Sequence, residues 1–475
     1  MFMLKDSVHF DTLKSQVKFQ QTPWDSLVRS GDLNKTELDV LKNLFQNGVS
    51  DSSNKKDLDA VFKIIKTTDN IAILQNCYSL LVDLFISEKN KPIYEIVSAK
   101  NVCQEYLQTL LDSFKKIPKD ASESNILVVE TLGLYTAIVL LLQVQFDDAF
   151  FANFLSNVYF PLFKKTFGFV NELQYTLIRY LQELAAVSHY RSVIFSKDND
   201  FVDHFFEIIL SPISKNSNNS SSKALGTNQT VLPNNNLTIQ IQYYSLLTIW
   251  LLTFENSIAS KISTKYATSL LKLLRLVTVT IKEKITRLSI SVLLNCCKNN
   301  KNFLKRMILL NNSKTLLANL SNRKFSDTEL VQDLSTLNEM FDEITQELNS
   351  FDEYTIELDS KELCWSPPHV DTQFWYDNVD KFRENNWKLL KKLCDLITEF
   401  SEYSASSDSN AKASLILQVV LSDMTHIVEM LPDSVEFIEK YNAKIKIMEL
   451  LNYPDSKVKY EALKTTQALV KNSFK

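Results

Sequence analysis

Glycine is scarce in this sequence of 475 residues, with five copies where average usage would supply about 33. The five are Gly31, Gly48, Gly133, Gly168 and Gly226. Phosphate-binding loops need several glycines within a few residues, because only glycine lets backbone N–H groups approach a phosphate closely. The spacing therefore excludes a P-loop, a G-x-G-x-x-G turn and a G-x-S-x-G turn. Tight β-hairpins also favour glycine, so its scarcity favours a helical chain.

Patterns typical of metal and cofactor sites are also missing. No C-x-x-C or H-E-x-x-H occurs, and no two of the five histidines are closer than 15 residues. Asp423, His426 and Glu429 share a helical face at i, i+3 and i+6, which is compatible with a metal site or, more simply, with a solvated face. A Ser/His/Asp triad assembled from distant positions is not indicated by any residue pattern. We expect no cofactor and no catalytic residue.

Composition limits the class of protein further. The net charge of −4 disfavours nucleic acid as the main partner. The start of the chain has no long apolar run, so we expect no signal peptide and six reduced, mostly buried cysteines in the cytoplasm. Two uncharged stretches, 131–146 and 239–254, are shorter than the roughly 20 apolar residues that a membrane-spanning helix needs. We interpret both as buried helices.

Helical periodicity recurs along almost the whole chain. Apolar residues spaced three and four apart form three stripes, which place their side chains on one helix face. The stripes are Leu74, Cys77, Leu81 and Leu84; Leu173, Leu177, Leu181 and Leu184; and Leu274, Val277, Ile281, Ile285 and Leu288. Short helices separated by polar turns are typical of diverged repeats. The pattern predicts an all-α, HEAT/armadillo-like helical-repeat solenoid in two domains.

The domain boundary is expected near residue 350. Ser326 and Glu329 have the spacing of a capping box, which predicts a helix start followed by an apolar heptad seam from Leu330 to Leu348. Pro367 and Pro368 then prevent a continuous helix. We therefore predict an N-terminal solenoid over 1–350, a linker over 351–362 and a C-terminal helical domain over 363–475. Residues 214–236, rich in Asn and Ser, are expected to form a mobile surface loop within the solenoid.

Two charged features are candidate partner-binding surfaces. Lys282, Lys284 and Arg287 form a mixed-charge helix face, with Glu283 four residues before Arg287 as an exposed ion pair. This face is either simply solvated or a rim for an acidic partner helix. Residues 327–362 hold 12 acidic residues and one basic residue, with Asp352 and Glu353 among them. This run is either the solvated side of a helix or a surface that attracts a basic partner.

The most unusual local sequence is L-C-W-S-P-P-H-V-D (363–371), followed by Phe374 and Trp375. Two prolines restrict the backbone and aromatic side chains anchor it. We expect Trp365 and Trp375 to fasten the linker to the C-terminal domain.

This segment, together with S-F-D-E-Y-T-I-E-L (350–358) before it, resembles the H-subunit family of the vacuolar proton-translocating ATPase, in its fungal branch. Other blocks are similar to that family in the same order. They are Trp24-Asp25, R-Y-L-Q-E-L-A (179–185), I-Q-Y-Y-S-L-L-T-I-W-L-L-T-F (241–254), I-K-E-K-I-T-R-L (281–288), D-M-T-H-I-V-E-M-L-P (423–432) and D-S-K-V-K-Y-E-A-L-K-T-T-Q-A (455–468). Residues 40–120 match poorly.

The resemblance implies a non-catalytic regulatory subunit on the cytosolic face of the vacuolar membrane, attached to the membrane only through the complex. Its N-terminal solenoid would bind the E and G subunits of the peripheral stalk. Its C-terminal domain would contact the N-terminal region of the pump's a subunit in the assembled pump. In the detached ATPase sector that domain would move onto the B subunit of the catalytic hexamer and the central rotor, and stop hydrolysis.

The family's inhibitory contact lies on a polar loop of the C-terminal domain. The segment 401–411 occupies the corresponding place by position alone. Its candidate contact residues are Ser404, Ser406, Ser407, Asp408 and Asn410.

Two other interpretations remain. A helical-repeat adaptor, such as an armadillo-type transport receptor, would line its groove with Trp and Asn at each repeat. The five tryptophans of this chain show no such period. An enzyme with an unrecognised site is the other alternative.

Overall fold

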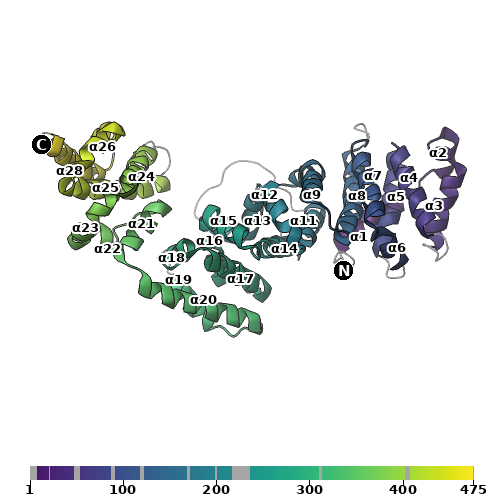
Figure 1. The fold of residues 1–475 in the computed structure, drawn as a ribbon, viewed down its shortest axis with the longest axis horizontal. Coiled ribbons are helices and arrows are strands. Elements are labelled where there is room, and N and C mark those ends of the chain that lie inside the picture. The colour runs from purple at the N-terminus through teal and green to yellow at the C-terminus, as the bar shows by residue number, and fades with distance from the viewer. Residues whose placement is uncertain are drawn as a thin grey trace. The chain divides into compact units, whose positions relative to one another are not determined.

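The computed structural model describes residues 8–20, 22–47, 54–86, 91–117, 122–167, 172–197, 200–216, 236–309, 313–401 and 407–473. All regular secondary structure in these residues is helical and none is strand (Figure 1). The fold is therefore all-α, as predicted. The chain forms two compact units, one from residues 1–300 and 319–335 and the other from 301–318 and 336–475. The loop expected at 214–236 falls mostly on 217–235, outside the described residues.

The first unit is an array of helices. Its helices are α1 (Val8–Phe19), α2 (Trp24–Ser30), α3 (Lys35–Asn47), α4 (Asn54–Thr67), α5 (Ile71–Ile86), α6 (Lys91–Val97), α7 (Lys100–Phe114), α8 (Glu123–Gln143), α9 (Asp148–Phe154), the π-helix η3 (Leu155–Tyr159), α10 (Phe160–Lys164), α11 (Glu172–Ala186), α12 (Ser188–Lys197), α13 (Asp200–Asn216), α14 (Asn236–Leu252), α15 (Asn256–Lys265), α16 (Ala267–Val279) and α17 (Glu283–Asn299). After them come α18 (Lys301–Leu309), α19 (Ser313–Ser321) and α20 (Thr328–Glu347). Helix α18, residues 313–318 of α19 and α20 from residue 336 on belong to the second unit.

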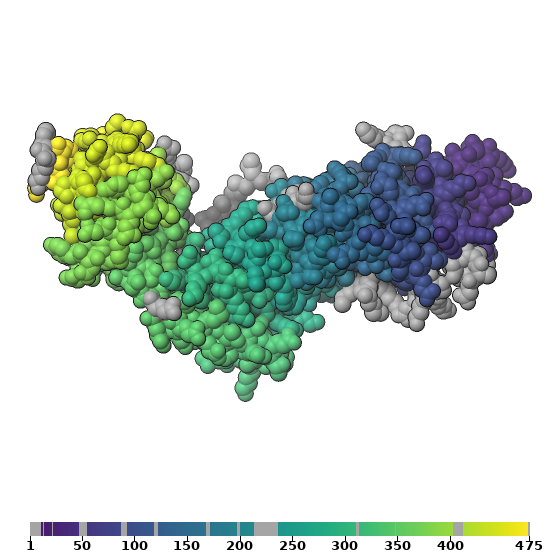
Figure 2. All heavy atoms as spheres, in the orientation of Figure 1, coloured from purple at the N-terminus to yellow at the C-terminus, as the bar shows by residue number. Residues whose placement is uncertain are grey.

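Packing in the first unit repeats every third helix. Helix α5 packs on α8, α8 on α11, α11 on α14, and α14 on α17 (Figure 1). In the space-filling view the colour, which stands for residue number, changes steadily along this unit, so consecutive parts of the chain lie next to one another (Figure 2). A period of three helices is the armadillo form of a helical repeat, in which each repeat buries its apolar face against its neighbours.

Helix α8 is buried between its neighbours from Val128 to Leu141, except at Glu130. The ring of Phe114 on α7 and the ring of Tyr78 on α5 approach Gly133 so closely that a Cβ there would lie 2.8 Å from Phe114 Cε1. By length and composition alone, two described helices could cross a membrane, Glu123–Gln143 and Lys412–Met430. Their apolar windows are 72% and 78% buried within the protein, as in the core helices of folded domains.

Most residues of the predicted apolar stripes are buried, but Leu173 is only partly buried and Ile281 is exposed. Leu74, Cys77 and Leu81 are fully buried on α5. Ile281 does not continue the third stripe, because α16 ends at Val279 and Thr280 adopts an extended conformation. Its side chain is 93% exposed, more than any other large apolar side chain in the described residues.

The start of α20 also differs from the predicted capping box. Asp327 caps this helix: its Oδ1 accepts from the backbone N–H of Glu329 at 3.0 Å and of Leu330 at 3.2 Å. Ser326 is turned instead toward Glu283 on α17, to which its Oγ donates at 2.9 Å. The heptad seam is confirmed from Leu330 to Ile344, whose apolar members are buried.

The second unit contains the segment that was expected to be a linker. Its helices after α20 are α21 (Ser350–Ser360), α22 (Pro367–Val370), α23 (Thr372–Asn378), the 3-10 helix η4 (Val379–Arg383), α24 (Glu384–Ser401), α25 (Ser407–Met430), α26 (Ser434–Lys440), α27 (Ala443–Glu449), the 3-10 helix η5 (Leu450–Asn452) and α28 (Ser456–Ser473). The linker conformation predicted for 351–362 is wrong. Asn349 and Asp352 form a capping box that starts α21, and Tyr354 and Leu358 are buried in the core of this unit. The exact domain ranges remain predictions.

Trp375 lies at the centre of the second core and is completely buried. It stacks on His426 with ring centroids 5.2 Å apart and packs edge-on to Tyr354. Trp365 does not share this role, since it is 42% exposed. The expected anchoring is therefore confirmed for Trp375 and wrong for Trp365.

Replacing Trp375 by alanine should leave a large cavity in the second core. We expect a loss of about 3–5 kcal/mol of unfolding free energy, which urea titration followed by circular dichroism would measure. The neighbouring Tyr376→Ala is the matched control, because Tyr376 is 68% exposed and its truncation should change stability by less than about 0.5 kcal/mol. Equal effects of the two substitutions would contradict this account of the core.

Candidate docking surfaces

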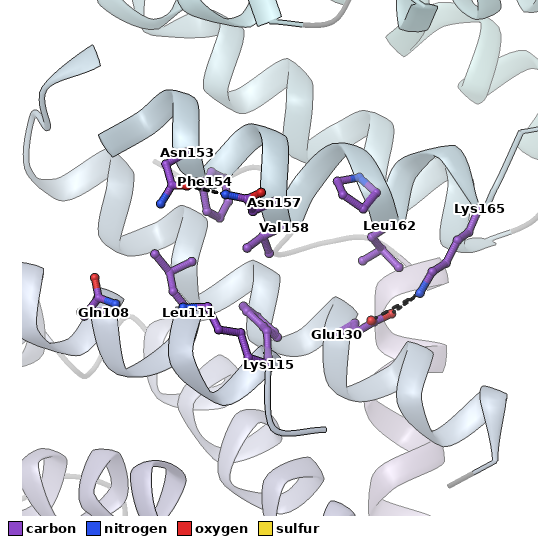
Figure 3. Close-up of a pocket in the computed structure, with 12 residues that line it drawn as sticks. Gln108, Leu111, Lys115, Glu130, Asn153, Phe154, Asn157, Val158, Leu162 and Lys165 are labelled. Carbon is purple, nitrogen blue, oxygen red and sulfur yellow. Dashed lines mark hydrogen bonds and ion pairs between the residues drawn. The ribbon is translucent and has the colours of Figure 1, made fainter. Parts of the chain in front are cut away.

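The first unit carries a pocket of about 460 Å³ between α7, α8 and the α9–α10 segment (Figure 3). Its apolar wall comes from Leu111, Phe154 and Leu162, and polar groups lie at its edges. At one end Lys165 pairs with Glu130, with Nζ 3.3 Å from Oε2 (Figure 3). The π-helix η3 lines part of the wall, and such bulges often mark functional sites.

The polar side chains that line this pocket are amides, lysines and one glutamate. None of its lining residues is a histidine, cysteine, serine or threonine. Asn157 donates from its side-chain amide to Asn153, which joins the two amides at the rim. The pocket offers an apolar surface with amide and charged groups at its border.

A second candidate surface lies where α17 begins. Arg287 does not pair with Glu283, as the sequence suggested, but with Asp327 at 3.3 Å and with Glu329. Glu283 instead accepts hydrogen bonds from the backbone N–H groups of Ser326, at 2.6 Å, and Asp327, at 2.8 Å. Arg287 and Glu283 thus hold the start of α20 against α17.

The other two residues predicted for this surface remain exposed. Lys282 precedes α17 and Lys284 lies in its first turn, and both side chains are exposed. Of the three predicted residues, the two lysines are therefore exposed, whereas Arg287 forms ion pairs within the protein.

Much of the acidic run is paired within the protein. Asp352 accepts from Lys305 at 2.9 Å and completes the capping box of α21. Glu353 is partly buried, and its burial beside Glu357 raises its pKa. Further ion pairs in the run join Asp342 to Lys314, Asp359 to Lys392 and Glu362 to Lys412. This pairing leaves less free negative charge than the sequence suggested.

The polar loop predicted at 401–411 is shorter than expected. Helix α24 extends to Ser401 and the backbone of α25 begins at Ser407, so residues 407–411 form its first turn. Ser404 and Ser406 lie outside the described residues, as do the side chains of Ser407, Asp408 and Asn410. Their role as contacts remains a prediction.

The second unit contains a buried cluster of ionisable side chains that sequence analysis did not identify. His369 on α22 has both ring nitrogens beside carboxylates: Nδ1 lies 2.9 Å from Asp423 on α25, and Nε2 lies 3.2 Å from Glu357 on α21. Tyr354 donates from its hydroxyl to Asp423 at 3.1 Å. The side chains of His369 and Asp423 are completely buried. The cluster joins three helices through charge-assisted hydrogen bonds.

This geometry favours a charged imidazolium. Burial by itself lowers the pKa of His369, but the carboxylates of Asp423 and Glu357 outweigh it and raise the pKa from 6.5 to about 9. Burial also raises the pKa of Asp423, against the opposing effect of His369 and Tyr354. A buried charge of this kind is tolerated only where opposite charge and hydrogen bonds satisfy it.

The cluster also replaces the metal site considered for α25. Asp423 faces His369, whereas His426 stacks on Trp375, so these two do not converge on one point with Glu429. No group of three potential metal ligands occurs in the described part of the chain. The signal that could have revealed the cluster was Asp423 itself, since a carboxylate in an apolar helix needs a buried partner. That partner is 54 residues away in the sequence, beyond the reach of any local pattern.

The buried imidazolium should make stability depend on pH. The pKa of His369 is about 9 when folded and about 6.5 when unfolded. Its contribution is therefore complete below pH ~6.5 and is lost as the pH rises through 9, by up to roughly 3 kcal/mol. We expect unfolding free energies, measured in urea at pH 6.5 and 9.5, to show this loss in the wild-type protein and not in His369→Gln.

Two further variants complete this test. Glu357→Gln removes one carboxylate, so the pKa of His369 should rise less on folding. The pH range over which the unfolding free energy falls should then be narrower than in the wild-type protein. His189→Gln is the control, since His189 is about a third exposed and its substitution should preserve the wild-type pH dependence. If the unfolding free energies of His369→Gln and Glu357→Gln both keep the wild-type dependence on pH, the assignment of a positive charge to His369 is contradicted.

Comparisons with known proteins agree across the chain. Two family models, both described as the H subunit of V-ATPase, match it, an N-terminal one over residues 8–341 and a C-terminal one over 347–474. A probable V-type proton ATPase H subunit of Caenorhabditis elegans is 33% identical over 242 residues, which are 50% of this chain and 51% of that protein. The V-type proton ATPase H subunit of Drosophila melanogaster is 30% identical over 241 residues, 50% of this chain and 48% of that protein. The chain thus spans about half the length of the curated relatives it matches.

Solved structures show only a distant likeness. An engineered protein is 11% identical with a TM-score of 0.38, over 96% of this chain and 98% of that one. A chain from a study of cadherin and β-catenin is 12% identical with a TM-score of 0.36, over 96% of this chain and 99% of that one. These scores are too low to bear on function. The two family matches cover nearly all of the sequence, and they follow the order of the sequence blocks noted above, so this chain belongs to the V-ATPase H-subunit family.

Proposed function

We propose that this chain is a non-catalytic regulatory subunit of a vacuolar proton-pumping ATPase. It activates ATP hydrolysis in the assembled pump and silences it in the detached ATPase sector by bridging stator and rotor. The observation that carries the proposal is the match of both family models, which together span residues 8–341 and 347–474.

The structure supports a role through contact surfaces. A helical-repeat array presents an extended surface to partners. The chemistry of an ATPase would need phosphate-binding loops, and the five glycines are too far apart to form one. The pocket of the first unit is lined without histidine, cysteine, serine or threonine. Regulation then acts on the motor through the positions of helical bodies, with no residue of this chain at the site of hydrolysis.

We propose the partners that the resemblance to the family implies. The first unit binds the E and G subunits of the peripheral stalk. The second unit contacts the N-terminal region of the pump's a subunit in the assembled pump, and the B subunit and the central rotor in the detached sector. The chain then works at the cytosolic face of the vacuolar membrane and is held there through the complex. Two helical units with separate cores allow two docked states, whose populations the partners would shift.

Affinity capture from cell extract would test this assignment. The full chain, tagged and expressed in cells that lack their own copy, should recover stalk and ATPase-sector subunits of the proton pump. It should also lower ATP hydrolysis by detached sectors when added back. Recovery of import cargo in place of pump subunits would favour the transport-receptor alternative and reject the proposal.

The predicted loop 401–411, which includes the first turn of α25, is proposed to make the silencing contact. Replacing residues 402–411 by a glycine–serine linker of equal length should give a several-fold rise in ATP hydrolysis by detached sectors, because the contact with the B subunit is lost. A coupled enzymatic assay on sectors reconstituted with each variant measures the effect.

A second polar segment of the same chain provides the matched control. Residues 217–235, replaced in the same way, should leave silencing unchanged. If the 402–411 variant silences hydrolysis as well as the wild-type protein does, this segment is not the inhibitory contact.

A further inference from the structure

The loop between α16 and α17 exposes apolar side chains that its sequence pattern would have placed in the core. Ile281 is 93% exposed and Val279, two residues earlier, is 58% exposed. Single exposed apolar residues are common on protein surfaces. Here two β-branched residues lie close together in the sequence, at a loop whose conformation is fixed by hydrogen bonds with a neighbouring loop.

A neighbouring loop holds this one in place. Arg323, between α19 and α20, donates from Nη2 to the carbonyl oxygen of Thr278 at 2.8 Å. The carboxylate of Glu283 accepts from Ser326 N, Ser326 Oγ and Asp327 N at 2.6, 2.9 and 2.8 Å. These hydrogen bonds from Asp327 and Ser326 lower the pKa of Glu283, so it stays ionised at neutral pH. A surface fixed before binding loses little conformational entropy when a partner docks.

The free charge around Ile281 is positive. Lys282, Lys284 and Lys324 are exposed, and none of them forms a salt bridge within the described residues. The nearby acidic groups are already engaged, Glu283 with the 326–327 backbone and Asp327 with Arg287. Glu329 also pairs with Arg287. The result is an apolar centre bordered by unpaired cations.

We propose that Val279, Ile281, Lys282, Lys284 and Lys324, here called the Ile281 surface, dock an acidic amphipathic helix of another pump subunit. Ile281 fits the hole between side chains on such a helix, as a knob does in helix packing. Carboxylates on either side of that hole pair with the lysines. The identity of the partner as a pump subunit rests on the proposed function, whereas its acidic and apolar chemistry follows from the Ile281 surface.

Binding kinetics of the full chain to pump complexes that lack this subunit would test the proposal. Ile281→Ser should speed dissociation by about tenfold, since it removes the central apolar contact. Lys282→Glu combined with Lys284→Glu should slow association by about tenfold at low salt, with a smaller effect at high salt, because steering by charge is screened. All these side chains are exposed, so thermal unfolding should be unchanged.

Matched variants in the same unit serve as controls. Phe45→Ser removes an apolar side chain that is 43% exposed, and Lys261→Glu with Lys272→Glu reverses two exposed lysines elsewhere. Both should bind like the wild-type protein. A photo-reactive amino acid at position 281 should cross-link to an acidic helical segment of another subunit.

The possible outcomes separate this inference from the proposed function. If the wild-type protein binds the pump and Ile281→Ser binds with the same kinetics, the inference fails and the proposed function stands. Cross-links to a second copy of this chain or to a basic segment also overturn it. If the wild-type protein does not bind the pump at all, both proposals fall together.

Discussion

The first unit depends on the burial of each helix against the third helix along the chain. Helices α8, α11 and α14 each lie between two such neighbours, and none could bury its apolar side chains by itself. Close approach is part of this packing, as the contact of Gly133 with the rings of Phe114 and Tyr78 shows. The scarcity of glycine in the sequence agrees with an array whose helices meet mainly through their side chains.

The second unit combines this apolar packing with a buried charged cluster. His369, Asp423 and Glu357 come from three helices and satisfy one another in the interior of the unit. Such a cluster is a weak source of net stability, because desolvation of the charges offsets much of their attraction. The cluster favours one arrangement of α21, α22 and α25 over others, since any shift of these helices would leave a buried charge unpaired.

The ends of the helices carry the features most relevant to partners. The loop after α16 is held by Arg323 and Glu283, yet it presents Ile281 to solvent. The same interactions that order the start of α20 pair Asp327 and Glu329 with Arg287, and leave Lys282 and Lys284 without an ion-pair partner in the described residues. A rigid loop on a helical scaffold is a common way to present binding residues.

Local patterns in the sequence were enough to determine the helical class, the buried stripes on α5 and α20 and the absence of phosphate-binding loops, because these follow from residue spacing and composition. They also identified the family, through blocks such as the one from 363 to 371. They could not determine which charged residues meet, because Arg287 pairs with residues 40 and more positions away and His369 pairs with Asp423 54 positions away. Periodicity also failed at Ile281, since an apolar residue in register with a stripe looks the same whether the helix continues or stops at Thr280. Only the tertiary structure decided that this side chain is exposed and that Tyr354 and Leu358 are buried in the second core, because both depend on contacts between distant parts of the chain.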